Sequence, residues 1–187
     1  MNAQVVMDER AIEQAGIAAR RHYNPIQQDS ATFLKMSAET GGASTLIEVE
    51  VAPGGGNMPH YHTTYAEHFE VVRGTLEVTV AGKTLTLRPG DTAIAPLDTA
   101  HNFHNPTDRP TTFLVTLRPG SPGFEKSLQI GYGLARDGLT TSKGLPKSLS
   151  HLALLLEMSE MRVAGPFNLV KPLFRFLARR ATYGRMT

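Results

Sequence analysis

Five of the seven histidines in the chain lie within one window of 45 residues, which is the first sign of a metal site. Side chains on a strand alternate between faces, so His60 and His62 point the same way if their segment is extended. Glu67 follows after a short connection, and His101 comes from a later segment. Three imidazoles and one carboxylate suit Fe(II), Mn(II), Ni(II), Co(II) or Zn(II) better than Ca(II) or Mg(II). The spacing therefore predicts one divalent transition metal held by these four side chains.

The same alternation predicts which side chains surround the metal. Phe69 shares the face of Glu67, and Phe103 shares the face of His101, so both are expected to wall the cavity, together with Met58. These three residues are the candidate substrate pocket. Simple core packing is an equally good interpretation of them, because such residues fill barrel interiors in any case.

Composition limits the class of protein. A chain of 187 residues with 41% hydrophobic and 19% charged residues is typical of one ordinary compact domain with room for extra helices. There is no cysteine, which excludes disulfides and thiolate metal ligands. Acidic residues at Asp8, Glu9 and Glu13, with no apolar segment before them, do not resemble a secretory signal, so we expect a cytoplasmic protein.

Charge is unevenly distributed along the chain. Residues 1–120 carry a net charge of −4 and residues 121–187 a net charge of +6. We expect the basic part to dock on the acidic part or on a partner subunit. Nucleic-acid binding is not expected, because no reading element accompanies the basic residues. Contact of the last helix with a membrane surface is a minor alternative.

Three segments are expected along the chain: an N-terminal helical segment over 1–25, a barrel over 26–120 and a helical C-terminal extension over 121–187. Short alternating runs separated by Gly, Pro and Asp favour a sandwich or barrel. Ala81-Gly82 fits a two-residue hairpin, and Arg88 to Asp91 fits a tight turn. The expected strands are Ser44–Val51, Phe69–Val72, Thr75–Val80, Lys83–Leu87, Thr92–Ala95 and Thr111–Leu117.

The helices are expected outside the barrel. Asp8 to His22 suits a short helix with Asp8 as its N-cap. Residues 124–145 are expected to be loop with a short helix, and Pro146 to Met161 to be an apolar helix. A last helix near Pro172 to Thr182 would display Arg175, Arg179 and Arg180.

Two stretches of the chain resemble the cupin superfamily. The first is Gly54-x5-His60-x-His62-x4-Glu67-x6-Gly74, which has every fixed residue of the first cupin motif. The second is Gly90-x5-Pro96-x-Asp98-x2-His101-x3-Asn105, which departs from the second motif only at Asp98, where the family usually has Gly. The resemblance covers about residues 24–120. It implies an all-β fold, a double-stranded β-helix or jelly roll, with His60, His62, Glu67 and His101 as metal ligands near one mouth of the barrel.

Function is left between three hypotheses. The first is a metal-dependent enzyme acting on a small organic molecule, an Fe(II)-type oxygenase above all, because four protein ligands leave about two coordination positions open. The second is a redox-neutral isomerase or lyase acting on a sugar or hydroxy-carbonyl compound. The third is a non-catalytic small-molecule-binding or regulatory cupin, since one fold hosts many activities. A homodimer is expected in each case, because barrels of this kind have exposed sheet edges.

Overall fold

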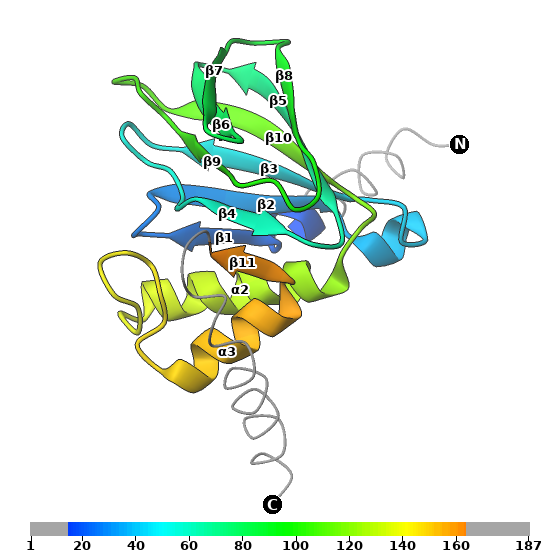
Figure 1. Ribbon diagram of the computed structural model, residues 1–187, viewed down its shortest axis with the longest axis vertical. Helices are drawn as coiled ribbons and strands as arrows, with labels where there is room; N and C mark the ends of the chain where they lie inside the picture. Colours follow the sequence, from blue (N-terminus) through cyan, green and yellow to red (C-terminus); the bar gives the residue numbers. More distant parts are fainter. Residues whose placement is uncertain (1–14, 164–187) are drawn as a thin grey trace, which may run out of the picture.

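Two antiparallel sheets face each other in the computed structural model, which describes residues 15–163 (Figure 1). Sheet A has six strands in the order β1-β2-β3-β10-β5-β8, and sheet B has five in the order β11-β4-β9-β6-β7. The strands are β1 Arg21–Asn24, β2 Asp29–Lys35, β3 Thr45–Val51, β4 His60–His62, β5 Ala66–Arg73, β6 Leu76–Val80, β7 Lys83–Leu87, β8 Thr92–Ala95, β9 His101–His104, β10 Thr111–Arg118 and β11 Met161–Val163. The predicted all-β jelly-roll class is confirmed.

Alternation of buried and exposed side chains builds the core between the sheets. Along β3 every second residue, from Thr45 to Val51, is buried, as expected for a strand with one face on the core. Phe69 of sheet A and Phe103 of sheet B both contact Phe113, at ring-centroid distances of 6.3 and 5.0 Å. Apolar burial of this kind is the main stabilising contribution to the sandwich.

Two glycines allow the backbone to follow this path. Gly82 has φ +77° and follows Ala81 at φ +51°, so the hairpin between β6 and β7 has positive φ at both turn residues, as the Ala81-Gly82 pair predicted. Gly56 lies where the segment before β4 crosses β9. A Cβ there would lie 2.5 Å from the Phe103 carbonyl oxygen, so only glycine lets the two segments approach this closely.

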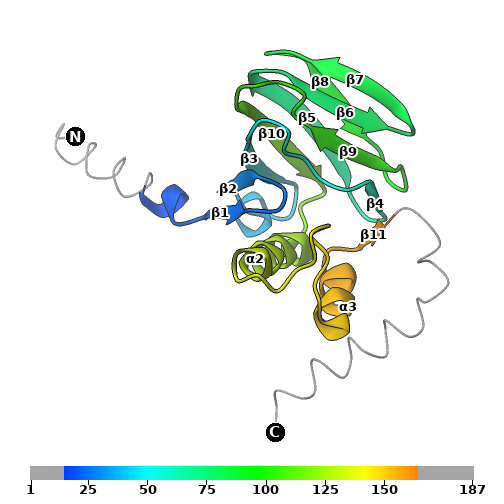
Figure 2. The same ribbon diagram turned by 90° about the vertical axis from the view of Figure 1, so that its left-hand side faces the viewer.

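The helices cover one side of the sandwich, next to β1, β4 and β11 (Figure 2). They are α2 Pro122–Arg136 and α3 Leu149–Met158, and a 3-10 turn, η1, spans Ser37–Thr40. The Ser121 hydroxyl caps α2 by accepting from the Phe124 backbone N–H at 3.1 Å. Buried Glu125 then fastens α2 to the barrel, because its Oε1 accepts from the Ser37 N–H and the Thr45 hydroxyl, both at 2.6 Å.

Three helices expected outside the barrel differ in their bounds from those of the structure. The helix predicted over Asp8 to His22 is present at 15–18 but ends before Arg21, because Arg21–Asn24 pairs with Asp29–Lys35 as an antiparallel hairpin. The short helix expected within 124–145 is the 15-residue α2, which begins at Pro122 and forms because its cap and Glu125 compensate for three glycines. The predicted helix ending at Met161 stops at Met158.

The C-terminal extension also contributes a strand that the sequence pattern did not indicate. Residues 161–163 pair antiparallel with β4, with Met161 opposite His62 and Val163 opposite His60. The β4 backbone has one register pair with β9, His60 opposite His101, so its other edge would present unpaired polar groups without β11. The last predicted helix, Pro172 to Thr182, and its membrane-surface alternative lie outside the described residues. No helix within residues 15–163 has the length and apolar character to cross a bilayer.

Candidate metal centre and its cavity

The four predicted ligand residues meet between the two sheets. His60 and His62 come from β4 and His101 from β9, all in sheet B, while Glu67 comes from β5 in sheet A. Each occupies an inward position of its strand, and each side chain is buried. One potential ligand atom from each residue lies within 4.8 Å of all the others, which is compact enough for a single ion.

Outer hydrogen bonds fix the position of the Nδ1 proton in His60 and His101. The Nδ1 atom of His60 lies 2.8 Å from the Met58 carbonyl oxygen, and that of His101 lies 2.8 Å from the Thr99 carbonyl oxygen. A carbonyl oxygen only accepts hydrogen bonds, so Nδ1 carries a proton in both rings. This leaves Nε2 as the inward nitrogen that can bind a metal through its lone pair. This is the arrangement that metal-ligating histidines usually have.

His62 is held by a longer chain of contacts. The Tyr65 hydroxyl donates to the Ser159 carbonyl at 2.9 Å and therefore accepts from Nδ1 of His62, 2.8 Å away. The Tyr65 ring also stacks on His62, with ring centroids 4.4 Å apart. Ser159 lies between α3 and β11, so the C-terminal extension orients a candidate ligand through Tyr65.

Two of the inward Nε2 atoms, those of His62 and His101, face the Glu67 carboxylate. Nε2 of His62 lies 3.2 Å from Oε1 of Glu67, and Nε2 of His101 lies 3.3 Å from Oε2. Both nitrogens are buried without a hydrogen bond among the described residues. If Nδ1 carries the proton, two lone pairs point at an anion, which is unfavourable unless a cation lies between them. The donor set therefore fits a divalent transition metal and could hold one.

The pKa values of these groups show the same need for positive charge. Burial would raise the pKa of Glu67, but the neighbouring His62 and His101 outweigh burial and hold that pKa well below its usual range. Burial lowers the pKa of His101, but the adjacent Glu67 carboxylate outweighs it and raises the value. Burial, reinforced by His62 and His101, lowers the pKa of His60 to about 3, which keeps His60 neutral and able to bind a metal.

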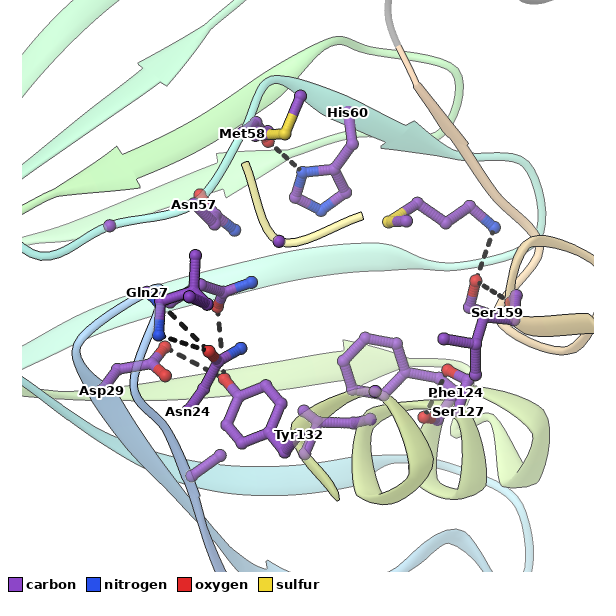
Figure 3. A pocket seen from close by; sticks show the side chains of 18 of the residues that line it. Asn24, Gln27, Asp29, Asn57, Met58, His60, Phe124, Ser127, Tyr132 and Ser159 are labelled. Atoms are coloured by element: carbon purple, nitrogen blue, oxygen red, sulfur yellow. Dashed lines mark hydrogen bonds between the residues drawn. The ribbon is translucent and has the colours of Figure 1, made fainter. Parts of the chain in front are cut away.

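A cavity of about 420 Å³ adjoins this group, and His60 and Glu67 form part of its wall (Figure 3). The three predicted pocket residues, Met58, Phe69 and Phe103, all line it. Met58 is 37% exposed, so the cavity reaches solvent on that side. Much of the remaining wall is apolar, and α2, α3, β2, β3 and the segment 142–146 all contribute to it, so a small organic molecule would find a largely apolar surface.

The sequence reasoning missed a polar pair in this wall. The Tyr132 hydroxyl of α2 donates to Oδ2 of Asp29, the first residue of β2, at 3.0 Å. Burial raises the pKa of Asp29 to about 7, and it also raises the pKa of Tyr132 well above its usual value. Neither residue lies in a recognisable motif, and 103 positions separate them, so no local signal was available.

Comparison with known proteins shows what part of the barrel is similar to. Residues 47–117 match the model of the cupin domain. A segment of 70 residues is 36% identical to the polyketide synthase CurC of Streptomyces cyaneus, covering 37% of this chain and 46% of that protein. The chain thus spans less than half the length of this curated relative.

Two solved structures are also similar to this chain. A sugar phosphate isomerase from a cupin superfamily of Silicibacter pomeroyi is 27% identical, with a TM-score of 0.47 over 52% of this chain and 69% of that one. The polyketide cyclase RemF of Streptomyces resistomycificus is 24% identical, with a TM-score of 0.45 over 51% of this chain and 68% of that one.

The Tyr65 contact yields a testable prediction. Tyr65→Phe keeps the ring but removes the acceptor for His62 Nδ1–H, so we expect metal affinity to fall about 10- to 100-fold with little change in folding. Competition with a metal chelator measures the affinity. Tyr23→Phe, at a residue that is 52% exposed, is the matched control and should bind metal like the parent. Equal affinity in all three proteins would show that Tyr65 does not support the site.

Asp29 yields a prediction about pH. Its folded-state pKa of about 7 lies above the ordinary value of 3.8, so its contribution to stability is complete below about pH 4 and is lost as pH rises through about 7. The penalty at high pH is at most about 4 kcal/mol. Asp29→Asn removes this titration, and we expect the variant to gain unfolding free energy relative to the parent between pH 5 and pH 8. Urea unfolding of both proteins at pH 5 and pH 8 measures this difference in unfolding free energy. The same pH dependence of stability in the parent and in Asp29→Asn would contradict the raised pKa of Asp29.

Proposed function

Because residues 47–117 match the cupin domain and the predicted ligands meet inside the barrel, we propose that this protein is a metal-dependent enzyme acting on a small, largely apolar organic molecule. The observation that carries the proposal is that the candidate metal ligands are shared with the cavity. His60 and Glu67 belong both to the four-residue group and to the cavity wall. A molecule in the cavity therefore lies next to the ion that these residues would hold.

The residues of the chain have distinct parts in such a site. His60, His62, Glu67 and His101 would hold the ion, which supplies Lewis acidity and, as a redox metal such as Fe(II), electrons for reaction with O2. The apolar wall, including Phe69 and Phe103, excludes water from the occupant. The contacts of Met58, Thr99 and Tyr65 keep the imidazole rings oriented before any molecule enters.

Two reaction classes fit this arrangement. An Fe(II)-type oxygenase fits because four protein ligands leave about two coordination positions of a six-coordinate ion open. A redox-neutral reaction such as isomerisation or cyclisation fits as well, because the Lewis acidity of the ion alone can polarise a carbonyl group of the occupant. The partial relative CurC, a polyketide synthase by name, is compatible with a substrate of apolar character.

A purely structural or ligand-storing role is less well supported. Such a role would suit an interior that is sealed or filled by side chains. Here about 420 Å³ lies beside His60 and Glu67 and reaches the exposed Met58. The site therefore has both a candidate ligand set for an ion and room for a reactant.

Metal content tests the ligand assignment. Elemental analysis of protein purified without added metal should find about one transition-metal ion per chain. In His62→Ala we expect that ion to be lost, because two imidazoles and one carboxylate bind much more weakly. His104→Ala is the matched control, since His104 lies on β9 but is exposed and pairs with Glu77 at 3.6 Å. Equal metal in the folded His62→Ala variant and the parent would refute the ligand set.

Oxygen dependence separates the two reaction classes. The metal-loaded protein is incubated with a panel of apolar phenols and hydroxy-ketones, in air-saturated and in oxygen-depleted buffer, while an oxygen electrode and mass spectrometry follow the reaction. An oxygenase consumes O2 with the substrate and is inactive without it. Conversion at the same rate in both buffers, giving a product of unchanged mass, would exclude the oxygenase and support an isomerase or cyclase.

A further inference from the structure

Asp29 has a carboxylate oxygen for which the described residues supply no partner. Its Oδ2 accepts from Tyr132, but its Oδ1 is buried and makes no hydrogen bond among residues 15–163. The whole residue is 1% exposed and lines the cavity. An unpaired carboxylate oxygen in such a place is costly, and its cost falls when a donor binds to it.

The surroundings of Asp29 keep it in place. Asp29 pairs with Asn24 across the β1–β2 hairpin, and Tyr132 fixes its other oxygen from α2. The carboxamide oxygen of Asn24 is itself occupied, because it accepts from the backbone N–H groups of Ile26 and Gln27 at 2.9 and 3.2 Å. Oδ1 of Asp29 is thus a rigid acceptor on a side chain that does not belong to the metal group.

The position of Asp29 in the cavity limits what can bind to it. Figure 3 shows Asp29, Asn24 and Tyr132 gathered at one side of the cavity, away from His60 and Met58. Apolar residues, including Phe69, Phe103 and Phe124, make up much of the wall. An occupant that reaches both ends therefore needs an oxygen for the metal, an apolar middle and a hydrogen-bond donor at its far end.

Two observations favour a hydroxyl group over an ammonium as that donor. Lys143 also lines the cavity and disfavours a cationic occupant. In addition, an ammonium needs an ionised partner, whereas burial raises the pKa of Asp29 to about 7 and leaves it partly neutral. A hydroxyl can donate to the carboxylate and accept from the carboxylic acid, so it suits both forms.

We propose that Asp29, positioned by Tyr132, binds a hydroxyl group of the substrate at the end of the cavity away from the metal ligands. The substrate class is then a hydroxylated, largely apolar compound whose metal-binding oxygen and distal hydroxyl are separated by an apolar body. This assignment rests on the proposed function, since it takes the metal centre as the second anchor.

Paired hydroxamic acids test the assignment without knowledge of the substrate. A hydroxamate group chelates the metal, and a straight alkyl chain of graded length carries either a terminal methyl or a terminal hydroxyl group. Protein loaded with Co(II) reports binding through its visible absorption, and titration gives Kd for each compound. At one chain length we expect the hydroxyl compound to bind about tenfold more tightly than its methyl partner.

Variants then locate the origin of that preference. Asp29→Leu should abolish the preference for the hydroxyl compound. If that variant does not fold, Asp29→Asn, which keeps size and polarity, is measured in its place and should reduce the preference severalfold. Ser127→Ala is the matched control, because Ser127 lines the same cavity but its hydroxyl is already bonded to the Phe124 carbonyl at 2.9 Å. The control should keep the full preference.

Each other outcome overturns a defined part of the proposal. Equal binding of both compounds at every chain length would mean that no hydroxyl site exists, while the metal enzyme would stand. An amine-terminated compound that binds more tightly than the hydroxyl compound would overturn the substrate class. Preference retained in folded Asp29→Leu would remove Asp29 from the site. If no hydroxamate perturbs the Co(II) absorption, the accessible metal centre and this inference both fail.

Discussion

The negative charge of one carboxylate, that of Glu67, is buried between the sheets, and the need to compensate for it explains most of the site. A charged group removed from water is expensive unless positive charge and hydrogen bonds compensate for it. Glu67 is held among three imidazoles whose outer nitrogens are already committed to oxygen acceptors. Compensation must therefore come from the centre of the group, where the four side chains face one another. The strand order of both sheets, and the glycine at position 56, keep that centre compact.

The part of the chain with regular alternation could be predicted well. Strands such as β3, β7 and β8 have one face on the core, so their sequences carry the period of two that indicates a strand. The same period of two places His60 and His62 on one face of β4, and both side chains are buried. Asp98 stands at the one position where this chain departs from the two cupin motifs. It adopts φ +56°, a backbone conformation that Asp tolerates better than most residues.

Segments that depend on distant contacts could not be predicted. The β2 strand is buried over its first five residues, so the alternation of a half-exposed strand is absent. The α2 helix contains three glycines, and contacts such as those of Glu125 with Ser37 and Thr45 come from residues about 80 positions away. The same is true of Asp29 and Tyr132, whose relation exists only after α2 packs beside the β1–β2 hairpin.

The Ser159 contact makes the order of synthesis matter for this barrel. All four candidate ligands leave the ribosome well before Ser159 and the strand that follows it, because translation runs from the N-terminus. Until that later segment arrives, Tyr65 lacks the carbonyl that directs its proton, and the outer edge of β4 has no partner. The orientation of His62 is consequently set only after residues 159–163 have been made, and a nascent barrel without them would lack this support.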